Sequence, residues 1–343
     1  MGSMHERVPT GSDDPSDRRR RRLLCVTAIG SAVPHWAFGQ SRKWRIAFLG
    51  GVAPDASVTR NAIEPFRQGL REAGYVEGQN LVLHFRWAEG KPDRLPGLAA
   101  ELMQLDPDLL VTMGPAPAML ARSTITQVPV VALVVDNPVE IGLVTDFARP
   151  GGNITGISSF GLELIAKRLQ LIKELVPTLR RVAVLMNPAT TTRSVFEVAL
   201  AQFERTLGLP TVLIEARGPE QFDAAFDQMA RQGVQGVVVV ADATFWTHRE
   251  RLHELVAKHR LPSVWGHRDY LSPNGLASYQ SDFPAIFRRG AGMVDRILKG
   301  AKPAVTPFEQ ATKLDLVINL KAAQALGITV PPALLVSADD VMR

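Results

Sequence analysis

Two short, almost unbroken apolar runs, Leu109–Met113 and Val130–Val135, set strict limits on the fold of this chain of 343 residues. Runs of this kind are typical of strands that are buried on both faces of a parallel sheet. Similar runs recur along the chain, and longer amphipathic stretches with helical periodicity separate them. Strands that alternate with helices indicate βαβ units, so the sequence predicts an α/β fold with helices on both faces of its sheets.

The predicted elements alternate over most of the chain. Strands are predicted at residues 44–50, 81–88, 109–113, 130–135, 182–186, 212–215, 236–241, 261–265, 276–279 and 314–319. Helices are predicted at residues 62–73, 92–105, 162–176, 194–207, 220–231 and 247–259, and a further helix begins near Pro284.

Residues 1–39 have the pattern of an export signal. Five arginines, Arg18–Arg22, precede the apolar run Leu23–Val33, and Ala37 and Gly39 are the small residues of a cleavage site. The arginines and the leucines after them also fit a twin-arginine signal, so the export route stays open. The apolar run is shorter than the roughly 20 residues that span a membrane. We expect a signal peptide and a periplasmic mature chain; a basic tail that binds nucleic acid is the alternative.

About 300 residues follow this leader, which is more than one hydrophobic core comfortably organises. The composition break at Arg149–Asn153 is a natural boundary between two lobes, and Ser272–Gly275 and Lys302–Pro307 are further turn-rich stretches. These features predict two Rossmann-like lobes with parallel sheets that are joined by three crossing strands. Lobe 1 is assigned residues 44–156 plus 281–310, and lobe 2 is assigned residues 157–280 plus 311–343.

Charge and cysteine content argue against several classes of function. The net charge is +5, but much of the excess lies in the leader, so the remainder gives no reason to expect a nucleic-acid partner. Cys25 is the only cysteine and also lies in the leader, so neither a disulfide framework nor a cysteine nucleophile is expected.

The sequence contains no recognisable catalytic constellation. Gly50–Gly51 lacks the further glycines of a dinucleotide fingerprint, and neither a phosphate-binding loop nor a Gly-x-Ser-x-Gly motif occurs. His248 and His253 are five residues apart and so do not share one helical face. We therefore expect no enzymatic activity, no cofactor and no metal site.

Ligands of open α/β sheets bind beyond the carboxyl ends of the strands, so residues at those ends are the candidate binding residues. Gly114, Pro115 and Ala116 start a helix whose free N–H groups suit a carboxylate, although Pro115 and Pro117 lack an N–H. Asp136 and Asp242 each follow a strand, and each is either a helix cap or a ligand contact; Asp242 suits an ammonium group.

The remaining candidates also allow two interpretations. Phe245 and Trp265 either wall an apolar pocket or belong to the core, and Ser57 and Asp282 are either turn and cap residues or cleft residues. The complete set of expected ligand-binding residues is Ser57, Gly114, Pro115, Ala116, Asp136, Asp242, Thr244, Phe245, Trp265 and Asp282.

Several longer motifs resemble one family over essentially Arg45 to Val341. They are Phe66–Leu70, Gly74–Asn80, Ala148–Gly156, Arg181–Pro188, Asp295–Pro303 and Leu316–Pro332. The family is that of the substrate-binding proteins of ATP-driven (ABC) importers, similar to tryptophan and aromatic amino-acid binding proteins. The resemblance implies a type I periplasmic binding protein whose cleft is lined by Ser57, Gly114–Ala116, Asp136, Asp242, Thr244 and Asp282. Many relatives have Thr where Pro115 stands. This chain therefore lacks that hydroxyl group, and a carboxylate would be recognised by backbone N–H groups instead.

The resemblance also implies partners: a membrane permease, and an ATPase subunit that performs the only catalysis. The sequence thus predicts a monomeric, extracytoplasmic solute-binding protein. It would capture an amino acid, or another small carboxylate with an apolar part, between two lobes that close about a hinge. A ligand-sensing periplasmic domain for a membrane receptor stays open because the same fold serves both roles. An exported α/β hydrolase would need a nucleophile and a base that the sequence does not reveal.

Overall fold

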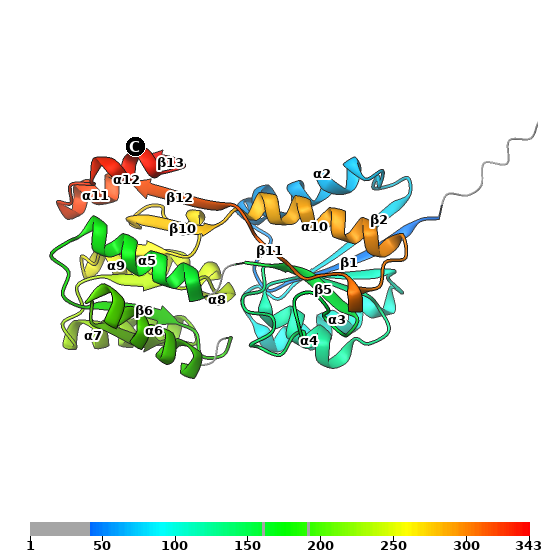
Figure 1. Cartoon of the computed structure of the whole chain (residues 1–343), viewed down its shortest axis with the longest axis horizontal. Coiled ribbons are helices and arrows are strands. Elements are labelled where there is room, and N and C mark those ends of the chain that lie inside the picture. Colours follow the sequence, from blue (N-terminus) through cyan, green and yellow to red (C-terminus); the bar gives the residue numbers. More distant parts are fainter. Residues whose placement is uncertain (1–41, 160–161, 191–192) are drawn as a thin grey trace, which may run out of the picture. The chain divides into compact units, whose positions relative to one another are not determined.

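A computed structural model describes residues 42–159, 162–190 and 193–343 of the chain (Figure 1). The predicted export signal, residues 1–39, lies outside the described residues. None of the described helices is both long enough and apolar enough to cross a membrane.

Six strands form the first sheet, which we call sheet A, and every neighbouring pair in it is parallel. In spatial order they are β11 (Glu309–Gln310), β5 (Ile154–Ser158), β4 (Val130–Leu133), β3 (Leu109–Met113), β1 (Trp44–Gly50) and β2 (Leu81–Trp87). Successive side chains of β1 point to opposite faces of sheet A, and because both sets are apolar, both faces must be covered by other elements. Ile46 and Phe48 pack into one hydrophobic cluster, whereas Ala47 and Leu49 pack into another on the opposite face.

Two pairs of helices cover sheet A. α2 (Glu64–Glu72) and α10 (Phe283–Leu298) pack side by side on one face, and α3 (Leu95–Gln104) and α4 (Pro115–Thr124) cover the other (Figure 1). The first two helices approach closely at Gly69, where a Cβ atom would lie 2.6 Å from the carbonyl oxygen of Arg288. Short helical segments lie at α1 (Ala56–Val58), η2 (Thr59–Ile63), η3 (Pro92–Arg94) and η5 (Pro303–Val305).

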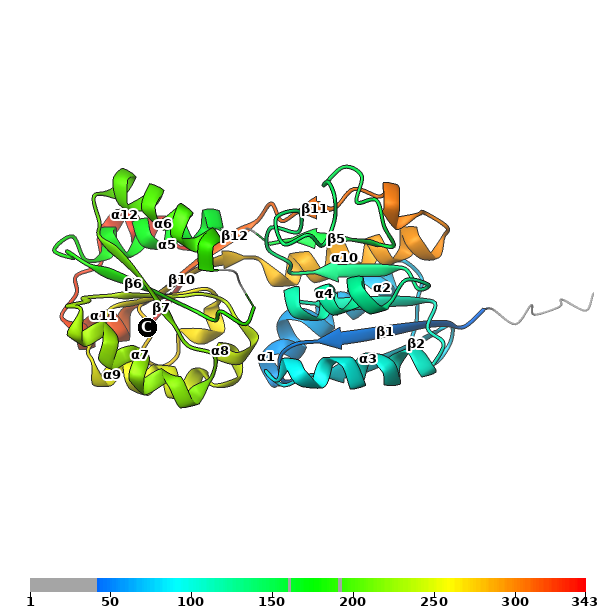
Figure 2. The same ribbon diagram turned by 90° about the horizontal axis from the view of Figure 1, so that it is seen from below.

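Seven strands form the second sheet, sheet B. In spatial order they are β13 (Asp340–Met342), β12 (Leu314–Asn319), β10 (Ala277–Ser281), β9 (Ser263–Trp265), β8 (Val237–Val239), β6 (Val182–Met186) and β7 (Thr211–Glu215). Figure 2 shows α5 and α6 on one side of this sheet and α7 and α9 on the other. The helices of this half are α5 (Leu162–Leu175), α6 (Arg193–Leu207), α7 (Pro219–Arg231), α8 (Ala243–Thr247), α9 (Arg249–Lys258), η4 (Arg268–Tyr270), α11 (Leu320–Leu326) and α12 (Pro332–Ser337).

The chain passes between the two sheets at three places, and residues 42–343 form one compact unit. The passages lie between β5 and α5, between β10 and α10, and between β11 and β12. The predicted α/β fold with two Rossmann-like lobes is therefore confirmed. Sheet B is mixed, since β12 runs antiparallel to β10. The reason is topological: β10 leads the chain out of sheet B, and β12 brings it back.

Candidate functional site

Each sheet has one point where its strand order reverses, and ligands of open α/β sheets bind beyond the strand ends at such points. In sheet A this point lies between β1 and β3, and in sheet B it lies between β6 and β8. The two points meet. A Cβ atom on Gly51, just after β1, would lie 3.5 Å from the Cβ of Ala243 and 3.8 Å from the Cδ of Pro117. The strand ends of both sheets therefore converge on one region.

The start of α4 forms one wall of this region. Gly114 has a φ of +94°, which favours glycine, and a Cβ atom there would meet nothing within 4 Å. Pro115 and Pro117 carry no N–H, so Ala116 supplies the only backbone donor among the first three residues of the helix. Gly114, Pro115 and Ala116 thus lie where the sequence placed them, with one free donor.

Asp242 lies at the end of β8 and caps α8. Its Oδ1 atom accepts hydrogen bonds from the backbone N–H groups of Thr244 (2.8 Å) and Phe245 (3.2 Å) and from Asn187 Nδ2 (3.2 Å). Its Oδ2 atom accepts from Thr190 Oγ1 at 2.8 Å. The capping interpretation is therefore observed, and Asp242 also orients two polar side chains that the sequence analysis missed. The sequence did contain a signal for these two residues, because Asn187 and Thr190 are polar and follow a buried strand.

Thr244 links the two halves of the chain. It is buried, and its Oγ1 donates to the carbonyl oxygen of Gly90, which follows β2 of sheet A, at 3.2 Å.

The side chains of Phe245 and Trp265 are fully buried in the core. Phe245 packs edge-on against Phe222 at 5.7 Å, and Trp265 stacks on Tyr270 at 5.6 Å. Trp265 is the last residue of β9 and Phe245 follows the Asp242 cap, but their side chains face α7 and α9, the helices that cover this side of sheet B.

Asp136 follows β4 in an unusual stretch of backbone. Val134 and Asn137 have φ values of +58° and +47°. A β-branched residue in this region is a true outlier, and such strain, of order 1–3 kcal/mol per residue, is concentrated at functional sites. The Oγ of Ser159, just after β5, donates a short hydrogen bond to Asp136 Oδ1. Burial raises the pKa of Asp136, and the bond from Ser159 and the charge of Arg168 oppose that shift.

Arg168 was not predicted, although its position carries a signal. It lies on α5 between Leu164 and Ile172, on the stripe that packs toward sheet B, where a cation is unexpected. Only 4% of the residue is exposed, and its Nε donates to the carbonyl oxygen of Tyr279 at 2.7 Å. Burial lowers the pKa of Arg168 to about 10, and the nearby charge of Asp136 opposes this shift.

A charged pocket of about 910 Å³ lies between residues of the two halves and contains the other two predicted residues. Ser57 is buried there and accepts a hydrogen bond from Asn61 (3.2 Å). Asp282 caps α10 through the N–H of Ala285 (3.0 Å) and pairs with Lys313 (2.7 Å). The lining residues are Asp55, Ser57, Arg60, Asn61, Arg249, His267, Arg268, Asp269, Ser272, Gln280, Asp282, Pro284, Lys313, Asp315, Asp340 and Met342.

Three polar contacts cross this pocket. Asn61 Nδ2 donates to Asp269 Oδ2 at 2.6 Å, Arg60 Nη2 lies 3.6 Å from Asp269 Oδ1, and Arg249 Nη2 lies 3.1 Å from Asp55 Oδ2. Each joins a residue that follows β1 of sheet A to a residue that follows a strand of sheet B. The pocket is therefore bounded by interactions between the halves.

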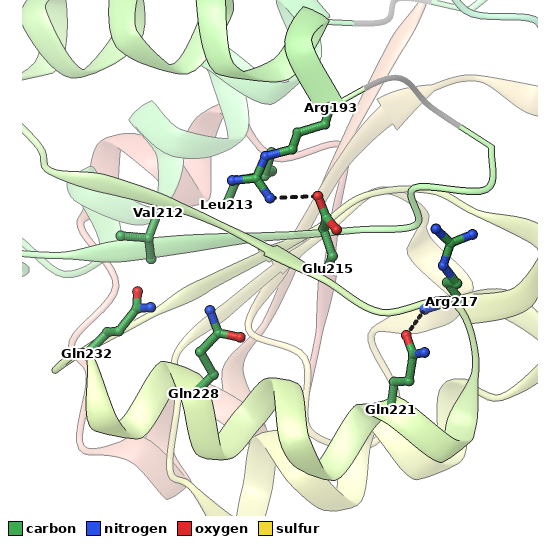
Figure 3. Close-up of a pocket in the computed structure, with 8 residues that line it drawn as sticks. All are labelled: Arg193, Val212, Leu213, Glu215, Arg217, Gln221, Gln228 and Gln232. Atoms are coloured by element: carbon green, nitrogen blue, oxygen red, sulfur yellow. Dashed lines mark hydrogen bonds and ion pairs between the residues drawn. The ribbon is translucent and has the colours of Figure 1, made fainter.

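A second hollow, of about 620 Å³, lies at the edge strand β7 beside α7 (Figure 3). Arg193 and Glu215, which pair at 2.7 Å, line this hollow together with three glutamines that project from α7 and the turn after it. None of the ten predicted site residues lines this hollow. Within the described ranges, no group of three His, Cys, Asp or Glu side chains could hold a metal ion.

Known proteins resemble this arrangement. A family model described as ABC transporter substrate binding protein matches residues 54–342. The structure of a conserved domain protein from Vibrio cholerae O1 biovar El Tor has 26% identity and a TM-score of 0.81, and covers 88% of this chain and 100% of that one. An ABC domain from Streptococcus pneumoniae, solved in complex with L-Trp, has 25% identity, the same TM-score and the same coverage. The tyrosine-binding protein of Clostridioides difficile (strain R20291) is 20% identical over 263 residues, 77% of this chain and 75% of that protein.

Proposed function

The chain belongs to the family of ABC transporter substrate-binding proteins, and from this premise we propose that it is the extracytoplasmic solute-binding component of an ATP-driven importer. Its partners are then a membrane permease and the ATPase subunit that drives transport. The chain itself binds solute and performs no catalytic step. Residues 1–39 serve as the export signal in this proposal.

The ligand that we propose is an α-amino acid. Two relatives support this class: one was solved with L-Trp, and another is named for tyrosine. The single observation that carries the proposal is the convergence of the two strand-order reversals at Gly51, Pro117 and Ala243. A ligand held there touches both sheets, and only a ligand that contacts both halves can stabilise their closed arrangement.

The first experiment measures the thermal unfolding of the chain from Gln40 onward with a panel of L-amino acids, sugars and nucleosides. A ligand at 100 times its Kd adds about 2.7 kcal/mol to the stability, which raises the melting temperature measurably. We expect a shift from at least one amino acid and none from the sugars. A shift from sugars or nucleosides alone would refute the ligand class.

A matched pair of glycine variants tests where the ligand binds. Gly51→Leu places a side chain between Ala243 and Pro117, whereas Gly97→Leu places the same side chain on the exposed surface of α3, where no atom lies within 4 Å. We expect Gly51→Leu to abolish the ligand-induced shift and Gly97→Leu to retain it. A full shift in Gly51→Leu would place the ligand elsewhere.

A further inference from the structure

We propose that Arg168 binds the carboxylate of the ligand and Asp136 its ammonium group, so that the protein selects free, zwitterionic α-amino acids. This inference rests on the proposed function and assigns the two charged contacts within it.

Arg168 has more donors than the fold uses. A guanidinium carries five N–H donors, and here the Nε group alone has a partner, the carbonyl oxygen of Tyr279. Neither Nη atom forms a hydrogen bond or an ion pair within the part of the chain that the structure describes. The Nη groups of this buried side chain are therefore available to an anionic group of a ligand.

Asp136 offers the opposite charge from the other half of the chain. It follows β4 of sheet A, whereas Arg168 lies on α5, which covers sheet B. Ser159, which donates a hydrogen bond to Asp136, lies just before the start of α5, the helix that carries Arg168, yet the two charged side chains form no ion pair within 4.0 Å. The hydrogen bond from Ser159 and the strained backbone at Val134 and Asn137 hold the carboxylate in place.

An α-amino acid matches this pair because its ammonium and carboxylate groups are attached to the same carbon atom. Each group would meet its opposite charge through charge-assisted hydrogen bonds, which are stronger than neutral ones. Since the two protein groups belong to different halves, a zwitterion would also join those halves, whereas a simple amine or a simple acid would engage only one of them.

The test compares three probes: L-tryptophan, its decarboxylated amine tryptamine, and N-acetyl-L-tryptophan. Calorimetry should show that the wild-type chain binds the amino acid at least tenfold more tightly than either analogue. Arg168→Gln should weaken L-tryptophan binding at least tenfold and leave tryptamine binding unchanged. Asp136→Asn should weaken L-tryptophan binding similarly and leave N-acetyl-L-tryptophan binding unchanged. L-tyrosine, tyramine and N-acetyl-L-tyrosine serve as a second set of probes.

Lys167→Gln is the matched control, because Lys167 is the adjacent residue on the exposed side of α5 and, among the described residues, donates only to Gln170 at 3.4 Å. If Arg168 were only a structural support for β10, Arg168→Gln would weaken all three probes equally, and the inference would fail while the proposed function stood. Wild-type binding that does not distinguish the three probes overturns the inference without any variant. If Arg168→Gln does not fold, the binding of the three probes to Arg168→Lys and Asp136→Asn tests the inference instead. If the whole amino-acid panel produces no shift, the proposed function fails as well.

Discussion

The side-chain amide of Asn61 donates a 2.6 Å hydrogen bond to Asp269 and thereby joins η2, beside sheet A, to η4, beside sheet B. Because this bond forms only when the two halves are together, it stabilises the arrangement that a ligand would also stabilise. The net contribution of such a bond is about 1 kcal/mol, more where the acceptor is charged.

We expect Asn61→Ala to weaken ligand binding about fivefold, with the affinity measured by calorimetry for the amino acid that gives the largest thermal shift. Gln68→Ala is the control, since the Gln68 amide donates to Glu72 within α2 and joins no separate elements. Equal affinities of Asn61→Ala and wild type would show that the bond does not contribute to the ligand-bound arrangement.

Two buried histidines make the fold sensitive to acid. Burial lowers the pKa of His253 to about 4 and that of His267 to about 3, whereas an unfolded histidine titrates near 6.5. The unfolded chain therefore binds protons that the folded chain excludes, so stability is complete above pH 6.5 and is lost as the pH falls below it. We expect each histidine to reduce the free energy of unfolding by about 2 kcal/mol between pH 7 and pH 5, as measured by urea denaturation.

His253→Phe tests this origin of the acid sensitivity. His253 packs against Trp265 at 4.7 Å, and phenylalanine keeps an aromatic ring there without a titrating group. The variant should lose about 2 kcal/mol less than wild type over the same pH interval. A pH dependence identical to that of wild type would assign the acid sensitivity to other groups.

Two glycines in helices should respond oppositely to alanine. At Gly69 a Cβ atom would lie 2.6 Å from the carbonyl oxygen of Arg288 and 2.7 Å from the Cβ of Ala291, so Gly69→Ala should force α2 and α10 apart and cost about 1–3 kcal/mol. At Gly97, within α3, a Cβ atom meets nothing, so Gly97→Ala should stabilise the chain by about 0.5–1 kcal/mol through helix propensity. Urea denaturation measures both changes, and a loss of stability in Gly97→Ala would contradict the argument.

Removal of the Asp242 carboxylate should affect both stability and binding. Asp242→Ala deletes the cap of α8, which costs about 1 kcal/mol, and leaves Asn187 and Thr190 without their common acceptor. Asp242→Asn retains a good capping residue and should lose less stability. Asp146→Ala, which removes a similar turn at the N–H groups of Ala148 and Arg149, should not change ligand affinity. Undiminished affinity in Asp242→Ala would exclude the role of this network in binding.

Continuous apolar runs allowed the sequence to predict that a strand exists, although not always its exact bounds. β3 was predicted with its observed bounds, and β4 was predicted two residues too long because Val134 has left-handed backbone. β5, Ile154–Ser158, was missed because Thr155, Gly156 and Ser158 interrupt its apolar pattern. Gly156 is required there, since a Cβ atom would lie 1.8 Å from the carbonyl oxygen of Ala132. That constraint comes from a neighbouring strand, which local sequence does not reveal.

The amino-acid sequence by itself determined the α/β alternation, the division into two lobes and the strand ends at which polar residues gather, because each depends on local hydrophobic pattern and turn chemistry. Only the tertiary structure decided what those residues do. It placed Phe245 and Trp265 in the core, made Asp242 a cap, and brought Arg168 near Asp136 although the two lie on different halves of the chain. The physical reason is that burial and pairing of charges depend on which strand ends face one another, and chain topology brings together residues that are far apart in sequence.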